Sequence, residues 1–94
     1  MRIRFHTDLS GDPHIYNHNV RESEVEEALL RRIETIKGRD ESFTAIGLTR
    51  SGRTLKIVYA EARDGDGIFV ITAYDLPEKQ RRALSRRQRR RRPQ

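Results

Sequence analysis

The sequence predicts an α+β domain in the order β-α-α-β-β-β-α, with a four-stranded, mostly antiparallel sheet. In the first half, apolar residues recur at the spacing of one helix face. After residue 42 the pattern changes to period two and becomes rich in β-branched and aromatic residues. The chain has 94 residues, and its last sixteen are almost purely basic. About 80 residues can therefore pack, which is enough for one sheet covered by one or two helices.

The first two elements are short. Residues 1–6 alternate between polar and apolar side chains, which predicts a half-buried strand. Asp12 is a good helix N-cap, and Pro13 suits the first helical position. We therefore expect a helix of one to two turns over residues 13–18. It would end at Asn19, a residue type that tolerates the left-handed conformation at a helix C-terminus.

The pattern over residues 22–36 predicts the longest helix of the domain. Acidic residues cluster at its start, where they suit the positive end of the helix dipole, and Gly38 would end it. Apolar residues recur at i, i+3, i+4, i+8 and i+11 and would form its buried face. These residues are Val25, Ala28, Leu29, Ile33 and Ile36.

Three segments then predict consecutive strands: residues 43–49, 54–60 and 67–74. The links between them are short and contain Ser-Gly or Asp-Gly, so both pairs should be antiparallel hairpins. The last segment is the most apolar, which favours a central position in the sheet. Pro77 ends it and opens a final helix.

The charges of the chain are divided sharply between two regions. Residues 1–78 hold eleven Lys and Arg against fourteen Asp and Glu, a formal charge of −3, whereas residues 79–94 carry +9 and no acid. We therefore expect a compact domain over 1–78 and an arginine-rich C-terminal helix or tail over 79–94. Such a block favours RNA or another nucleic acid as partner. Its arginines are Arg81, Arg82, Arg86, Arg87, Arg89, Arg90, Arg91 and Arg92.

Two alternative interpretations of this basic block stay open. It can be a solubilising extension that binds polyanions only incidentally, or it can pair with an acidic protein. The chain has no cysteine, which excludes a disulfide scaffold and a thiolate metal site. No apolar run approaches the roughly 18–20 residues of a membrane span, and residues 1–20 lack a signal-peptide core. We expect a cytoplasmic protein that does not enter a membrane, of undetermined oligomeric state.

His14 and His18 stand four residues apart and would share one face of the short helix. Two histidines can bind a metal, but no third ligand follows at a diagnostic spacing, so we predict no metal or other cofactor. General acid–base chemistry is the second interpretation, because histidine titrates near neutral pH. The third is structural: one imidazole orients the loop and the other faces solvent.

Other candidate residues come from the predicted strands and turns. Arg50 and Arg53 flank a Ser-Gly turn and could clamp a phosphate, or be ordinary solvated turn residues. Tyr59 and Tyr74 could stack on a base or donate a proton, or be core aromatics with only their hydroxyls in water.

Across residues 2–80, the order of these motifs resembles a compact bacterial domain family of unassigned function. That family is similar to the BrnT-type toxins of toxin–antitoxin pairs, which have a RelE-like ribonuclease fold. The resemblance implies metal-independent RNA cleavage, in which the 2′-hydroxyl attacks its own phosphate, and an antitoxin protein as partner. It is carried by His18-x-Val20, a helix Glu-Val-Glu-Glu-Ala-Leu, Ala45-Ile46-Gly47, Gly52-Arg53-x-Leu55-x-Ile57-Val58-Tyr59 and Phe69-Val70-Ile71-Thr72-Ala73-Tyr74.

The sequence departs from the BrnT-type pattern at three places. A Lys-His-Gly-Val segment of those toxins corresponds here to residues 17–20, which keep only the histidine and the valine. Their Glu-Arg pair becomes Glu41-Ser42, and the arginine that ends their last strand becomes Tyr74. Two arginines that would stabilise a phosphorane are thus absent, and Arg39, Arg50 or Arg53 would have to substitute.

These observations lead to one hypothesis and two alternatives. The leading hypothesis is an RNA-directed, toxin-like protein, a metal-independent endoribonuclease with His18, Arg53 and Tyr74 as catalytic residues. Arg50 and the arginines of the tail would bind the nucleic acid. The first alternative is a non-catalytic module that binds nucleic acid or protein, and the second is a metal enzyme using His14 and His18.

Overall fold

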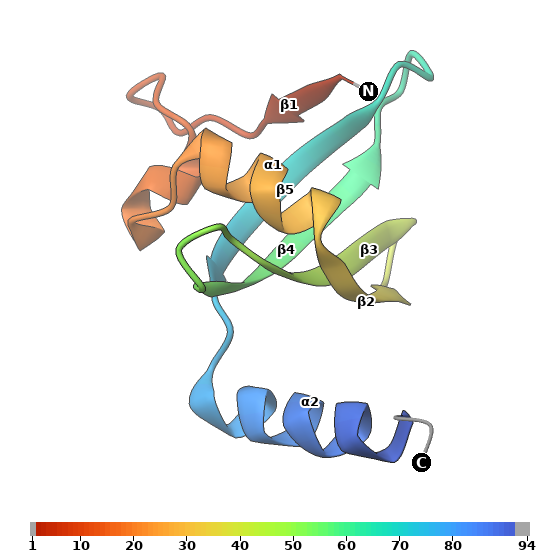
Figure 1. The fold of residues 1–94 in the computed structure, drawn as a ribbon. Coiled ribbons are helices and arrows are strands. Elements are labelled where there is room, and N and C mark those ends of the chain that lie inside the picture. Colours follow the sequence, from red (N-terminus) through yellow and green to blue (C-terminus); the bar gives the residue numbers. More distant parts are fainter. Residues whose placement is uncertain (1, 92–94) are drawn as a thin grey trace.

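The computed structural model describes residues 2–91 and has an α+β fold with two α-helices and a five-stranded mixed sheet (Figure 1). The strand order is β1-β5-β4-β3-β2. Strand β1 pairs parallel to β5, and every other neighbouring pair is antiparallel. In chain order, the elements are β1 (Ile3–Phe5), the 3-10 helix η1 (His14–His18), α1 (Glu22–Leu30), β2 (Arg32–Lys37), β3 (Ser42–Leu48), β4 (Thr54–Glu61), β5 (Ile68–Asp75) and α2 (Glu78–Arg91).

Helix α1 covers one face of the sheet, and the main core lies between them (Figure 1). Val25, Ala28 and Leu29 of α1 are buried there, as the helical spacing predicts. Gly47 of β3 lies directly under α1, where a Cβ atom would come 1.9 Å from the carbonyl oxygen of Ala28. Glycine is therefore required for the close contact between this helix and the sheet.

The prediction of one helix over 22–36 and of four strands is wrong. Helix α1 ends at Leu30, and residues 32–37 form β2, which adds a fifth strand at the edge of the sheet. Three of these six residues are β-branched and so suit a strand. Asp40 and Glu41, with φ angles of 53° and 61°, turn the chain tightly into β3. Ile36 is consequently 56% exposed instead of buried on a helix face.

Most other predicted elements are present. The three strands after residue 42 and a helix after Pro77 are confirmed, and Asn19 has the expected left-handed conformation, with a φ of 56°. The first strand is shorter than predicted, and Met1 lies outside the described residues. Pro13 is not helical: it has a ψ of 134° and forms a bridge with Thr7, so the short helix begins at His14.

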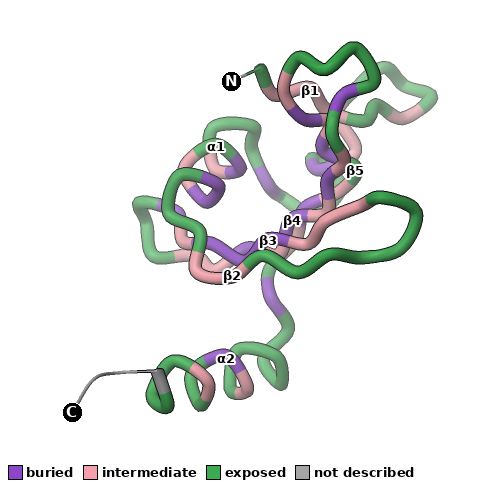
Figure 2. Tube along the Cα trace, turned by 90° about the vertical axis from the view of Figure 1, so that its right-hand side faces the viewer, coloured by how far each residue is buried: buried purple, intermediate pink, exposed green. Residues whose placement is uncertain are grey.

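Helix α2 lies on the opposite face of the sheet from α1 and is mostly exposed (Figures 1 and 2). A small second core of Ile46, Leu76 and Leu84 joins it to the sheet. Arg87 also forms a bidentate ion pair with Glu34 of β2, with both N–O distances at 2.8 Å. The Glu34 side chain is only 7% exposed, which strengthens this pair relative to a surface one. Within residues 2–91, neither helix is long and apolar enough to cross a membrane.

Candidate functional site

Five rings from β5, from η1 and from the segment that follows β1 form a continuous series. In spatial order they are Phe69, His6, His14, His18 and Tyr74, and we call this series the ring row. The successive centroid separations are 6.4, 5.9, 5.3 and 5.7 Å. Each ring is half-buried or exposed, so every ring of the row is at least partly accessible to solvent.

Pairing with β5 places the first histidines of the row. The parallel pairing of β1 with β5 ends at Phe5 and Val70. The chain then continues beside β5: the backbone N–H of His6 donates to the Val70 carbonyl, and that of His14 donates to the His6 carbonyl, both at 2.8 Å. These main-chain hydrogen bonds bring the imidazoles of His6 and His14 together beside β5.

A carboxylate orients the central imidazole. One oxygen of Asp8 lies 2.9 Å from Nδ1 of His14, and the other accepts a 2.6 Å hydrogen bond from the Asn17 amide. The hydrogen bond to His14, with the one from Asn17, lowers the pKa of Asp8. Asp8 is therefore ionised at neutral pH and only accepts, so Nδ1 of His14 must donate to it. Nε2 of a neutral His14 is then free to accept a proton.

Arg53 lies behind His18 and ties it to the sheet. All three nitrogens of its guanidinium donate internally: Nε and Nη2 to Asp75 at 2.5 and 3.0 Å, and Nη1 to Glu24 at 3.1 Å. Nη1 and Nη2 also donate to the backbone carbonyls of Asn19 and His18, at 2.7 and 3.3 Å. The Asp75 hydrogen bond raises the pKa of Arg53, and the same bond lowers that of Asp75.

The three residues predicted from sequence to be catalytic therefore lie close together, but Arg53 differs from the two rings in how far its donors are already bonded. The rings of His18 and Tyr74 are neighbours in the ring row. Arg53 contacts the His18 carbonyl, but it is only 22% exposed and its donors are already used. A phosphate would have to displace Asp75 or Glu24 to reach it.

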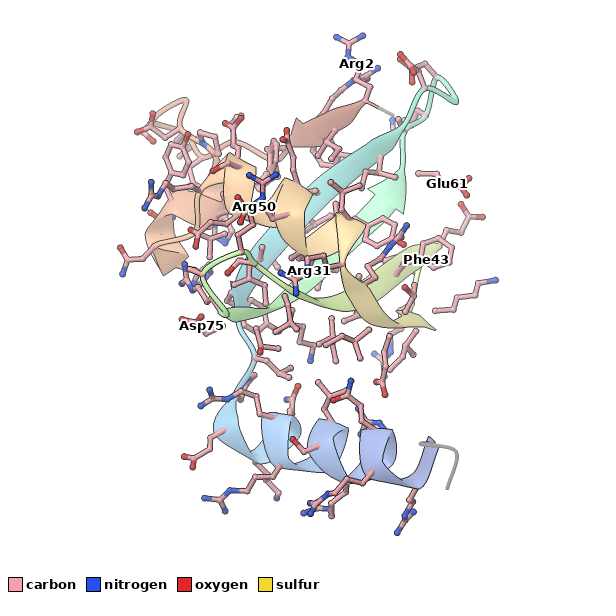
Figure 3. The ribbon with its side chains drawn as sticks, viewed as in Figure 1. Arg2, Arg31, Phe43, Arg50, Glu61 and Asp75 are labelled. Carbon is pink, nitrogen blue, oxygen red and sulfur yellow. The ribbon has the colours of Figure 1, made fainter. Side chains whose placement is uncertain are left out.

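Two other candidates lie away from the ring row. Arg50 is exposed in the loop between β3 and β4, where its backbone N–H donates to Glu27 of α1 at 3.0 Å (Figure 3). Tyr59 is buried in the main core, stacked on Phe43 with ring centroids 5.5 Å apart. Its hydroxyl accepts from Arg32 at 3.3 Å, so Tyr59 is a core aromatic.

The predicted nucleic-acid-binding arginines mostly lie on the exposed surface of α2. Arg87 is the exception, because it is committed to Glu34. Arg81 lies near enough to Asp75 to contribute to the lowering of its pKa, which places the first turn of α2 close to the end of β5 (Figure 3). Arg91 ends α2, and Arg92 lies outside the described residues. The exposed arginines are Arg81, Arg82, Arg86, Arg89 and Arg90.

The donors in the ring row do not form a metal centre. Within the described part of the chain, no group of three or more His, Asp or Glu side chains is arranged to hold a metal ion. The chemistry that the row itself offers is proton transfer, because Asp8-oriented His14 and His18 have ring centroids only 5.3 Å apart.

Comparison with protein-family models, with curated proteins and with solved structures gives no match for this chain. Sequence reasoning missed His6, Asp8 and Phe69. His6 stands on the polar side of an alternating strand, next to a turn, and that position was the available signal. Phe69 and Asp8 join the row only through pairing and loop closure, which no local pattern reveals.

Proposed function

We propose that this protein is an RNA-directed, toxin-like endoribonuclease that acts without a metal ion. The observation that carries the proposal is the pair of adjacent imidazoles, His14 and His18, with Asp8 hydrogen-bonded to the first. Two neighbouring imidazoles can supply both the base and the acid that RNA cleavage by its own 2′-hydroxyl requires. A RelE-like or BrnT-like relationship, with an antitoxin protein as partner, belongs to the same proposal.

In this mechanism Nε2 of His14 takes the proton of the 2′-hydroxyl. The 2′-oxygen attacks the adjacent phosphorus, and the bond from phosphorus to the 5′-oxygen breaks. Protonated His18 gives its proton to that leaving oxygen, so the products are a 2′,3′-cyclic phosphate and a 5′-hydroxyl. The Tyr74 hydroxyl can donate a hydrogen bond to a phosphate oxygen as charge develops on it. His18 therefore keeps the proton-transfer role expected from sequence.

The charge distribution supports RNA as the substrate. The exposed arginines of α2 begin near Asp75, at the Tyr74 end of the ring row. They can neutralise several phosphates of a strand that runs along the row. Rings that face solvent can stack on unpaired bases, which favours single-stranded RNA over a duplex.

The experiment is a cleavage assay on single-stranded RNA by the full chain, with His14→Ala and His18→Ala as test variants. Removing a positioned acid or base should lower the rate roughly a hundred- to ten-thousand-fold, and chelator should change nothing. Lys37→Ala is the control, because Lys37 is exposed on the strand at the far edge of the sheet. Cleavage that survives both histidine replacements, or that chelator abolishes, refutes the mechanism.

One observation favours a second function, a module that binds RNA without cleaving it. The Arg53 guanidinium, which donates to the His18 carbonyl, is fully engaged in internal hydrogen bonds, so it does not face a developing phosphorane charge. The cleavage assay and an RNA-binding titration at several salt concentrations together separate the two functions: salt-dependent RNA binding by the wild-type chain with no 2′,3′-cyclic phosphate among the products supports the binding module.

A further inference from the structure

A cavity of about 470 Å³ adjoins the Phe69 end of the ring row. It lies against β4, β5 and the loop that joins them, and it is lined mainly by Arg4, Ala60, Glu61, Arg63, Phe69 and Ile71. Its volume is within the usual range for small-molecule sites, roughly 300–1,000 Å³. An aromatic ring, aliphatic side chains, two guanidinium groups and the carboxylate of Glu61 thus meet in one concave place.

The two arginines of this cavity differ in whether their guanidinium groups already form an ion pair. Arg63 is exposed and forms no ion pair within residues 2–91, so its guanidinium is available to a ligand. Arg4 donates from Nη2 to Asp64 at 2.5 Å, which fixes its side chain beside the cavity. Nε of Arg4 is buried and has no hydrogen-bond partner among the described residues. An unsatisfied buried donor is costly, and a small movement toward an acceptor would relieve it.

These groups match the parts of a nucleotide. A planar base can stack on the half-buried ring of Phe69, and aliphatic neighbours can support its edges. A guanidinium offers phosphate two parallel donors. Phe69 belongs both to this cavity and to the ring row, because its ring lies 6.4 Å from that of His6. A strand bound along the row therefore reaches the cavity with its next nucleotide.

We infer that this cavity is a nucleotide subsite in which the base stacks on Phe69 and the phosphate binds Arg63, supported by Arg4. The inference rests on the proposed RNA-directed function and specifies where one nucleotide of the substrate lies. It concerns binding of a single nucleotide, so it can be tested separately from cleavage.

The probe is adenosine 5′-monophosphate, titrated into the full chain and followed by NMR of aromatic and arginine side-chain resonances. We expect saturable shifts of Phe69 and of the Arg4 and Arg63 side chains. Phe69→Leu keeps an apolar side chain but removes the stacking face, and it should weaken binding roughly five- to a hundred-fold. Arg63→Gln should weaken it about ten-fold. Arg31→Gln is the control, with the same charge change at the exposed end of α1 (Figure 3).

Ribose 5-phosphate and adenosine test the two halves of the ligand, and each should bind about ten-fold or more weakly than the whole nucleotide. Shifts confined to α2, ribose 5-phosphate binding as tightly as the nucleotide, or no saturable shift would each overturn the subsite. Arg63→Gln keeps the test valid if Phe69→Leu fails to fold. Nucleotide binding without RNA cleavage would refute the nuclease alone, whereas cleavage without nucleotide binding would refute the subsite alone.

Discussion

The rings of His18 and Tyr74 lie 5.7 Å apart between centroids, although one residue ends the 3-10 helix η1 and the other lies near the end of β5. Arg53 underlies this contact, because it bonds to the His18 carbonyl on one side and to Asp75, the residue after Tyr74, on the other. A partly buried polar group that links two elements positions the side chains they carry. The geometry of the ring row therefore depends on a residue that is not itself in the row.

Replacing Arg53 by Met should destabilise the protein, because Asp75 and Glu24 would lose their partner and two backbone carbonyls would lose a donor. Hydrogen bonds to charged groups contribute about 1.5–3 kcal/mol each, so we expect the free energy of unfolding to fall by a few kcal/mol. Denaturant titration measures it. Arg50→Met, in the same loop but exposed, is the matched control. Equal stability of the two variants would show that the Arg53 network contributes nothing.

The carboxyls of Asp8 and Asp75 predict how stability depends on pH. The pKa of each is lowered in the folded protein, by His14 and by Arg53 respectively. Each therefore stabilises the fold above its unfolded pKa of about 4, and this contribution is lost as pH falls through the lower folded pKa. The free energy of unfolding of the wild type should decrease more steeply below about pH 4 than that of Asp75→Asn. Identical pH profiles would contradict the role of the ion pair between Arg53 and Asp75.

The exposed arginines of α2 should control how RNA affinity depends on salt. Replacing Arg81, Arg86 and Arg90 by Gln should weaken RNA binding and flatten the plot of log affinity against log salt, by roughly 0.7 for each phosphate that is no longer neutralised. Substitution is better than deletion of the helix, because Leu84 of α2 covers Ile46 of the sheet. Arg87→Gln is the control, since Arg87 pairs with Glu34. An unchanged salt slope in the triple variant would show that other residues bind the phosphates.

Leu29 and Ile36 distinguish the observed fold from a single helix over 22–36, which would bury both side chains. Leu29 is 4% exposed in the main core, whereas Ile36 is 56% exposed on the edge strand β2. Leu29→Asp would bury an unpaired charge and should abolish cooperative unfolding, while Ile36→Asp should unfold cooperatively near the wild-type midpoint. Thermal unfolding measures both. Equal damage from the two substitutions would support the single helix.

The sequence predicted the fold correctly where local patterns are enough to determine the secondary structure. The three strands from β3 to β5 have clear period-two patterns and short turns, and the start of α1 has both acidic residues and apolar spacing. Strand β2 was missed because Ile33 and Ile36 continue the helical spacing by coincidence. Their conformation is decided by pairing with β3, which is a tertiary interaction.

The site could be predicted only in part for the same reason. His18 and Tyr74 were suggested by residue type and order, and the structure makes them neighbours. His6 and Phe69 join them because β1 pairs parallel to β5, and a parallel crossover leaves no local trace in the sequence. For Arg53 the residue type suggested a role in ligand binding that its tertiary contacts do not leave open. A turn arginine suggests a phosphate clamp, but the carboxylates that occupy it come from α1 and β5.

The central claim is that RNA lies along the ring row, and NMR titration with a single-stranded RNA that cannot be cleaved tests it most directly. Methylating every 2′-hydroxyl removes the nucleophile and leaves the bases and phosphates in place. We predict saturable shifts at His6, His14, His18, Phe69 and Tyr74, accompanied by shifts in the exposed arginines of α2. Shifts confined to α2, or centred on α1 with the five rings unaffected, would contradict the claim.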